Sequence, residues 1–284
     1  MKLHFILLIL SVFLLQSCAN YVQVFETNSN NVNIKDKAYI YENDDVRISF
    51  NFWEEKGLMS FEIFNKLDIP LYIDWKKSSY IDNTVKLDYW TDKEINLSTE
   101  IYSNYYYRLP FSNMPTKKTI GTSVSALVKE ERITFIPPKS KYERKKFYIF
   151  PYSSFELPKT TSPREVSMSE NSNKKTKIYE NSYTEKTSPI VFRNFITYST
   201  SENFDKEFYI DCEFYISKIK EMDKRHFEQV KRDKIGRTIY DDNDFPVLIQ
   251  PFKNKTSFYV RIPQAESIKY RGNPLFQKRK VNYE

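Results

Sequence analysis

The strict alternation of apolar and polar residues is the feature that most constrains this chain. In "VRISFNFW" the apolar side chains stand at every second position, at Val46, Ile48, Phe50 and Phe52. The same period returns in "LMSFEIFN" and in "EFYIDCEFYIS". Period two is typical of strands with one buried face, whereas an amphipathic helix repeats every three to four residues. The sequence therefore predicts a mainly β protein.

Turn signals separate these short strands, beginning with Asn43-Asp44-Asp45 and the segment from Glu54 to Gly57. Short strands with turns roughly every 8–12 residues are typical of antiparallel sandwiches and barrels. We therefore expect an antiparallel β-sandwich over residues 38–265, with at most one short helix after the first 17 residues. That helix is predicted within 219–232, "IKEMDKRHFEQVKR". Both one sandwich and two are compatible with the pattern; one is preferred.

Four segments lack the alternation. Residues 91–131 break the strand pattern, and residues 158–188 contain almost no apolar side chains. We expect both to be loop insertions, because a polar segment cannot offset the entropy of ordering. Residues 18–37 are expected to form a tether, and residues 266–284 a basic C-terminal tail.

The N-terminus has the form of an export signal. Lys2 precedes the apolar run Leu3–Leu15, which is shorter than the about 20 residues that a membrane span needs. The run ends in "LQSC", which resembles the lipobox of bacterial lipoproteins. The resemblance implies that residues 1–17 are a signal peptide and that the thiol of Cys18 carries fatty acids such as palmitate. Several acyl chains would make this attachment effectively permanent.

The residues after Cys18 indicate where the lipoprotein is delivered. Ala19 stands where the inner-membrane retention signal of that family would have Asp, which favours the outer membrane. Residues 20–23 hold none of the acidic residues that favour surface display in lipoproteins of the Bacteroidota type. We therefore expect a lipid-anchored protein on the periplasmic side of the outer membrane.

A second resemblance lies in "MSFEIFNKLDIPLYIDWKKSSYI", residues 59–81. It is similar to a segment of uncharacterised Bacteroidota lipoproteins, and to immunoglobulin-like domains in which a strand ending in Asn leads into the next across the sandwich. The resemblance implies an immunoglobulin-like β-sandwich but no activity. The cysteine pair and core tryptophan of antibody domains are absent from the sequence.

The supply of catalytic and metal-binding residues is small. His226 is the only histidine after the signal peptide, and we expect it to be an exposed helix residue. No G-x-S-x-G motif or glycine-rich phosphate loop occurs. Cys212 lies on the predicted buried face of a strand, where a thiol is unreactive. We predict no catalytic residues, no metal and no cofactor, because a zinc site normally needs two or more His or Cys ligands.

Acidic residues leave one enzymatic alternative. The cluster Asp241-Asp242-Asn243-Asp244 does not fit the spacing of a calcium loop and is interpreted as a polar turn. Carboxylates such as Asp44, Asp45, Glu54 and Glu55 would suffice for a hydrolase only if the fold paired them. We therefore expect a protein that is not an enzyme and keep an uncharacterised hydrolase as an alternative.

Aromatic residues are concentrated in one irregular segment: Tyr102, Tyr105, Tyr106, Tyr107 and Phe111, with Arg108 among them. Exposed Tyr and Arg side chains often anchor interfaces, and aromatic rings can stack on sugars. The segment is the candidate contact for an envelope protein or a glycan; packing over the sandwich edge is the structural alternative. Trp53, Trp75 and Trp90 are interpreted as core or rim residues.

The net charge of +7 is concentrated in Lys139–Lys146 and Lys269–Lys280. Nucleic acid is not an expected partner of an exported protein, whereas anionic lipid headgroups, an acidic glycan or an acidic protein would fit a basic surface. Together these features predict a lipid-anchored, non-enzymatic binding or scaffolding module. The alternatives are a surface glycan-binding lipoprotein that uses residues 102–111 and the hydrolase.

Overall fold

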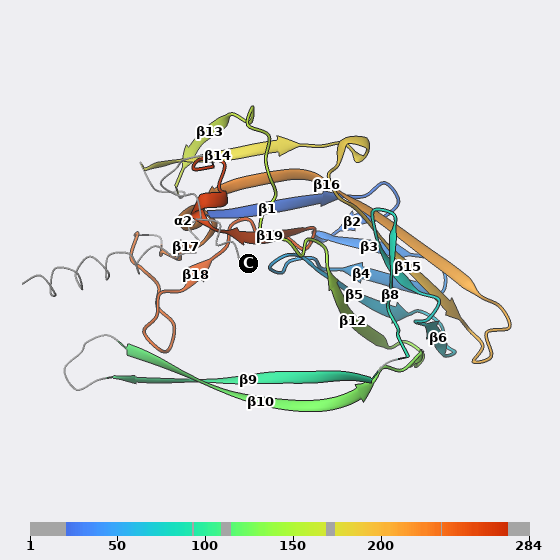
Figure 1. The fold of residues 1–284 in the computed structure, drawn as a ribbon. Helices are drawn as coiled ribbons and strands as arrows, with labels where there is room; N and C mark the ends of the chain where they lie inside the picture. Colours follow the sequence, from blue (N-terminus) through green and yellow to red (C-terminus); the bar gives the residue numbers. More distant parts are fainter. Residues whose placement is uncertain (1–20, 93, 109–114, 169–173, 234, 272–284) are drawn as a thin grey trace, which may run out of the picture.

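The computed structural model describes residues 21–92, 94–108, 115–168, 174–233 and 235–271, and over 94–129 only its backbone. It confirms the predicted fold class. The chain is mainly β, its paired strands are antiparallel, and two curved sheets pack against each other (Figure 1). Among the described residues the one α-helix is α2 (Lys224–Phe227).

The smaller of the two sheets has five strands in the order β12-β5-β4-β3-β2. Its strands are β2 (Asn33–Lys35), β3 (Ala38–Glu42), β4 (Val46–Phe50), β5 (Leu58–Asn65) and β12 (Lys141–Tyr148). The alternation read from the sequence is the alternation of burial: Val46, Ile48 and Phe50 are buried, and the residues between them are partly exposed. Period two therefore turns one face of β4 toward the core.

The larger sheet has ten strands, with β11-β6-β15-β16-β1-β19 as its main path. Four further strands branch off this path: β14 pairs with β16 and β13, and β7 pairs with β15 and β8. The strands are β1 (Tyr21–Asn28), β6 (Leu71–Asp74), β7 (Ser79–Asp82), β8 (Val85–Asp88), β11 (Ile133–Ile136), β13 (Pro163–Ser167), β14 (Lys175–Ser182), β15 (Val191–Ser199), β16 (Phe208–Asp223) and β19 (Ser257–Ile262).

Aromatic side chains from both sheets form one core. The ring of Phe52, just after β4, lies 5.5 Å from Phe192 of β15 and 5.1 Å from Phe214 of β16. Edge-to-face contacts of this kind add about 0.5–1.5 kcal/mol per pair to the free energy of burial. Because strands from before and after residue 188 share this core and the ten-stranded sheet, the described residues form one sandwich rather than two.

Residues 21–28 differ from the expected tether. They form β1, which lies between β16 and β19 in the ten-stranded sheet. Val22, Val24 and Phe25 are at most 1% exposed. The interpretation failed because the segment is short and is followed by a polar, Asn-rich stretch, whereas its burial comes from two strands more than 180 residues away in sequence.

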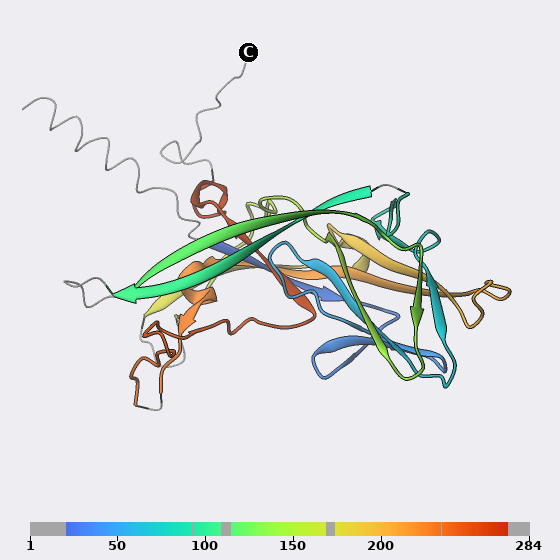
Figure 2. The ribbon, with the colours of Figure 1, turned by 90° about the horizontal axis from the view of Figure 1, so that it is seen from below.

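Residues 91–131 are also not an irregular loop. They contain β9 (Glu94–Arg108) and β10 (Pro115–Lys129), which pair along their whole length and with no strand of the two main sheets. Figures 1 and 2 show this hairpin running beside the sandwich. Its sequence lacks the period of a half-buried strand because the hairpin belongs to neither sheet.

Three further expectations are corrected. Residues 158–188 include β13 and β14, which extend the ten-stranded sheet through β16. The helix predicted within 219–232 is present but shorter than that range, since β16 continues to Asp223 and α2 spans only four residues. The basic tail begins later than residue 266, because Ser267 is fully buried and Ile268 packs against the core; residues 272–284 lie outside the described part.

Two minor strands, β17 (Gln229–Val230) and β18 (Leu248–Ile249), pair with each other, and η1 (Glu185–Thr187) and η2 (Gln264–Glu266) are single 3-10 turns. Within the described ranges, no helix has the length and apolar content that crossing a membrane requires.

Candidate functional site

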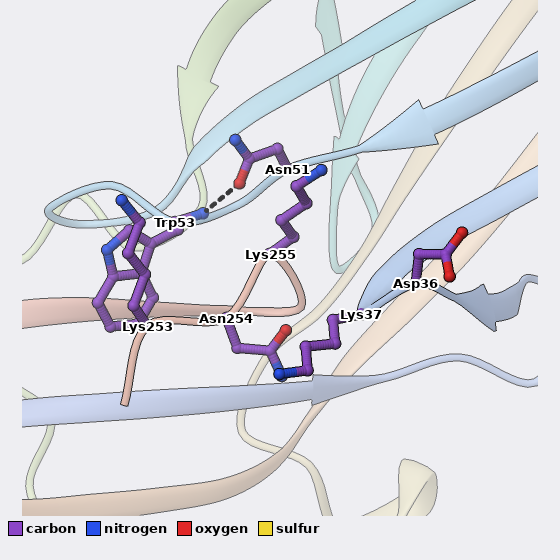
Figure 3. A pocket seen from close by; sticks show the side chains of 7 residues that line it. All are labelled: Asp36, Lys37, Asn51, Trp53, Lys253, Asn254 and Lys255. Carbon is purple, nitrogen blue, oxygen red and sulfur yellow. Dashed lines mark hydrogen bonds between the residues drawn. The ribbon is translucent and has the colours of Figure 1, made fainter. Parts of the chain in front are cut away.

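A polar pocket of about 430 Å³ lies where three loops meet, and we call it the Trp53 pocket (Figure 3). Its lining comes from the turn between β2 and β3, from the segment after β4, and from the segment before β19. These contribute Asp36, Lys37, Asn51, Trp53, Lys253, Asn254 and Lys255. The volume is in the range of small-ligand sites in proteins.

Hydrogen bonds join two of the three loops to each other and to β1. The amide of Phe52 donates to the carbonyl oxygen of Lys255 at 2.8 Å, which joins the segment after β4 to the segment before β19. The hydroxyl of Thr27 in β1 donates to the carbonyl oxygen of Thr256 at 2.7 Å. Asp36 and Lys37 both have positive φ, which makes the tight turn between β2 and β3. The pocket is therefore built on the rigid strands beneath it.

Trp53 forms one wall of the pocket and is only partly buried. Its ring packs against Phe227 and Tyr259 at centroid distances of 6.1 and 5.3 Å, and its indole N–H donates to Oε1 of Gln250 at 3.3 Å. These contacts fix the ring orientation while part of its surface stays accessible. We had interpreted Trp53 as a core or rim residue; it is a rim residue that also lines a pocket.

The pocket presents mainly hydrogen-bond donors. Oδ1 of Asn51 accepts from the amide of Trp53 at 3.2 Å, and Oδ1 of Asn254 accepts from the amide of Thr256 at 3.3 Å. The two side-chain amides can therefore offer their nitrogen donors to a ligand. Three lysines stand against one aspartate among the lining residues. A ligand rich in acceptors and negative charge would complement this lining.

A second pocket, of about 420 Å³, surrounds the first residue of β1, and we call it the Tyr21 pocket. It is lined by Tyr21, Asp223, Lys224, Arg225, Gln264, Lys269 and Tyr270. The register pairs Tyr21 with Asp223 of β16 and with Ile262 of β19, so the pocket lies at one end of these three strands. The Trp53 pocket lies toward the other end, where β19 begins.

The tyrosine-rich segment predicted as a contact site lies within β9. The register pairs Tyr105 with Lys118 and Tyr107 with Thr116, and it pairs Tyr102 with Gly121. Successive positions of a strand alternate between its faces, so positions 105 and 107 share one face of the ribbon, and positions 102, 106 and 108 share the other. Phe111 lies outside the described residues.

Of Cys18 and His226, two residues considered individually in the sequence, the structure describes only His226. Cys18 lies outside the described residues. His226 is buried rather than exposed as expected: its Nδ1 donates to the carbonyl oxygen of Met168 at 2.9 Å, and its ring packs against Phe252. A carbonyl oxygen only accepts, so this bond assigns the proton to Nδ1. His226 is buried because β16 extends beyond the predicted end of the strand and brings His226 against residues 166–168.

Cys212 is fully buried on β16, as predicted, and burial raises the pKa of its thiol far above the ordinary value. The remaining tryptophans also agree with the prediction. Trp75 is fully buried and donates to Oγ1 of Thr134 at 2.7 Å, and the indole N–H of Trp90 donates to the carbonyl oxygen of Glu130 at 2.8 Å.

Two of the four acidic residues considered for a hydrolase, Asp45 and Glu55, have structural partners. Asp45 accepts a hydrogen bond from the Tyr198 hydroxyl at 2.9 Å, and Glu55 forms an ion pair with Arg261. Oδ1 of Asp241 accepts from the amides of Asn243 and Phe245, so residues 241–245 form the predicted polar turn. Over the described ranges, no group of three or more His, Cys, Asp or Glu side chains is placed to hold a metal ion.

Sequence reasoning did not find either pocket. The only local signal for the first was the "KNK" run at 253–255, next to a strand. Its other walls come from residues about 200 positions earlier, and only the pairing of β19 with β1 brings them together.

Comparison of the chain with protein-family models, with curated proteins and with solved structures found no match. The resemblances noted for residues 15–18 and 59–81 therefore rest on those residues alone. The chemistry of the two pockets and of the hairpin is the basis on which a function is proposed.

Proposed function

We propose that this protein is a lipid-anchored module of the bacterial outer membrane, facing the periplasm, that acts by binding and not by catalysis. Its ligand site is the Trp53 pocket, and the ligand class is an acidic saccharide. The observation that carries the proposal is the donor-rich lining: three lysines and two side-chain amides beside an accessible tryptophan. Carboxylate or sulfate groups would pair with the lysines, hydroxyl groups with the amides, and a sugar ring with the indole.

The position of the pocket supports this role. Lys253 and Lys255 precede Ser257, which pairs with Glu26, whereas the other end of β19 pairs with Tyr21. Five strand steps at about 3.3 Å separate Glu26 from Tyr21, or about 17 Å. An anchor at Cys18 would hold the Tyr21 end at the membrane and leave the part of the Trp53 pocket lined by Lys37 and Lys255 farther from it, whereas the Trp53 ring packs against Phe227 of α2.

A binding experiment tests the ligand class. The probes are a tetramer of galacturonate and a neutral tetramer of glucose, titrated calorimetrically into the lipidated protein in detergent. We expect the acidic probe to bind more tightly than the neutral one. The variant Lys37→Ala with Lys255→Ala should weaken binding of the acidic probe by at least about tenfold, because charge-assisted hydrogen bonds contribute roughly 1.5–3 kcal/mol each.

The matched control is Lys139→Ala with Lys145→Ala, two exposed lysines outside the pocket. This variant should bind the acidic probe like the unaltered protein. Equal affinity for the two probes, or equal losses in the two double variants, would refute an acidic-saccharide site at Trp53.

The anchor is tested separately. Growth with labelled palmitate should label the protein, and Cys18→Ser should abolish the label and leave an uncut precursor. Label retained by Cys18→Ser, or mature protein without lipid in the soluble fraction, would refute lipidation. Protease treatment of intact cells should leave the protein whole if it faces the periplasm.

The hairpin supports a second candidate function, the binding of an envelope protein. Its two strands have 15 residues each and pair only with each other among the strands that the structure describes, so their outer edges are open to further pairing. The segment that contains Tyr105 and Tyr107 lies on one of these strands. Crosslinked partners that disappear in Tyr105→Ala with Tyr107→Ala would favour this function; an unchanged set of partners would dismiss it.

A further inference from the structure

The Tyr21 pocket has an excess of positive charge at one end of the sandwich. Asp223 accepts from Arg225 through both carboxylate oxygens, at 3.0 and 2.9 Å, so the one acid among the lining residues is already paired. Lys224 lies 3.8 Å from Glu228, which is held more closely by Arg261 at 3.0 Å. Lys269 is exposed. Because Arg225 is paired with Asp223, the excess positive charge at the opening comes from Lys224 and Lys269.

Two tyrosines form the floor of this pocket. Tyr21 is 7% exposed, and its ring meets that of Tyr270 edge to face at 5.8 Å. The ammonium group of Lys269 lies 4.9 Å from the centre of the Tyr270 ring. The hydrogen bond from Lys269, followed by that from Tyr21, lowers the pKa of the Tyr270 phenol, as expected beside a cation. The pocket therefore combines basic groups with amphipathic aromatic rings, the residue types enriched at membrane interfaces.

The proposed anchor determines where this pocket would lie. Cys18 and Tyr21 are three residues apart, and a chain spans at most about 3.6 Å per residue, so Tyr21 would lie within about 11 Å of the Cα atom of Cys18. The headgroup layer on each side of a bilayer is roughly 5–8 Å thick. Because β1 is a buried strand from its first residue, the sandwich has no long tether by which it could move away.

We propose that the Tyr21 pocket binds the phosphate of an anionic phospholipid headgroup and thereby holds the sandwich in one orientation on its membrane. This rests on the proposed lipidation of Cys18. Lys224, Arg225 and Lys269 supply the donors for the phosphate oxygens, and the ring of Tyr270 lies at the level of the headgroups. The part of the Trp53 pocket lined by Lys37 and Lys255 is then directed away from the bilayer.

Hydrogen–deuterium exchange of the lipidated protein in vesicles tests the proposal, after mass spectrometry has established the lipid on Cys18. The vesicles are phosphatidylcholine alone or phosphatidylcholine with phosphatidylglycerol. We expect slower exchange at residues 222–226 and 264–270 in the vesicles with phosphatidylglycerol, and loss of this difference in about 1 M salt, where the Debye length falls to about 3 Å.

The variant Lys224→Glu with Lys269→Glu should abolish the lipid-dependent protection, since each basic residue near an anionic surface strengthens association by about fivefold. Lys139→Glu with Lys145→Glu, which makes the same change of charge outside the pocket, should retain it. Both variants should show the unaltered unfolding temperature, because all four side chains are exposed.

Three outcomes would overturn the inference. Protection that does not depend on phosphatidylglycerol in a lipidated protein would refute the headgroup site and leave the anchor intact. Equal protection from free glycerol phosphate added to phosphatidylcholine vesicles would make the pocket a site for a soluble anion. Absence of lipid on Cys18 would refute both the anchor and the inference.

Discussion

At the scale of single residues, the hydrogen bonds of Asn65 explain why an asparagine ends β5 in the segment at residues 59–81. Its side chain is fully buried at the end of β5, and Nδ2 donates to the carbonyl oxygens of Ile69, Ile136 and Pro137 at 2.9–3.1 Å. Oδ1 accepts from the amide of Leu67 at 2.9 Å. The side-chain amide of Asn65 thus supplies hydrogen-bond partners for backbone groups at the point where the chain passes from the five-stranded to the ten-stranded sheet.

Asn65→Ala should destabilise the protein by about 3 kcal/mol, because several buried backbone groups would lose their partner at once. The free energy of unfolding from urea denaturation measures the effect. Asn33→Ala, at an exposed position of β2, is the matched control and should change that free energy by less than about 0.5 kcal/mol. Similar losses in the two variants would contradict this account of Asn65.

Gly57 is required by both conformation and space. Its φ is +66°, and a Cβ atom at this position would lie 2.7 Å from Cγ of Phe258 in the core. Gly236 also has a positive φ, of +84°, but has open space around it.

Gly57→Ala should therefore cost about 3 kcal/mol of stability, and Gly236→Ala about 1 kcal/mol, the strain of the backbone alone. Thermal unfolding of the two variants isolates the clash with Phe258 as their difference. Equal unfolding temperatures would mean that Phe258 can move aside at no cost.

At the scale of elements, contacts at the base of the β9–β10 hairpin attach it to the sandwich. There Trp90 donates to the carbonyl oxygen of Glu130, and Lys146 forms an ion pair with Glu130 at 2.9 Å. Arg144 lies over the ring of Trp75 at 4.1 Å and donates to the carbonyl oxygen of Tyr89 at 2.7 Å. The contacts hold the two ends of the insertion against the core.

Replacing residues 94–129 by a short Gly/Ser linker should shift the unfolding temperature by less than about 4 °C, or roughly 1 kcal/mol at this size. The reason is that no strand of either main sheet pairs with the hairpin. Removal of β13 and β14, whose β14 pairs with β16, is the contrasting deletion and should destabilise strongly. Loss of cooperative unfolding in the linker variant would show that the hairpin belongs to the core.

At the scale of the whole molecule, the many buried tyrosines make stability depend on pH in the alkaline range. Burial raises the pKa of Tyr39 from 10.0 to about 12, a hydrogen bond with Thr27 acting in the opposite direction. Burial is also the main cause that raises the pKa of Tyr21, Tyr80, Tyr89 and Tyr198. The folded state therefore holds these phenolic protons more tightly than the unfolded chain.

A raised pKa in the folded state contributes stability that is complete below the unfolded value and is lost as pH rises through the folded value. The free energy of unfolding should thus stay constant up to about pH 9 and fall between about pH 10 and pH 12, with Tyr39 alone contributing about 2–3 kcal/mol. Urea denaturation at a series of pH values measures this, and Tyr39→Phe should reduce the slope. A free energy unchanged between about pH 8 and pH 12 would contradict the burial of these phenols.

Much of the fold was predictable because its signals are local. Alternation such as that at 46–52 reports which side of a strand faces the core, and turn residues such as those at 43–45 mark where strands end. These features predicted the fold class and the buried Cys212 correctly. The failures at β1 and β16 share a cause: their burial depends on partners distant in sequence, which no local pattern reports.

By itself the sequence determined a mainly β sandwich and the prediction of an anchored cysteine, because side-chain periodicity and the resemblance to a lipobox both lie in adjacent residues. Only the tertiary structure decided that the expected tether is a buried strand and that Trp53 meets Lys37 and Lys255 in a pocket. The physical reason is that a pocket consists of surfaces from separate segments, and their meeting is set by strand pairing and core packing over the whole chain.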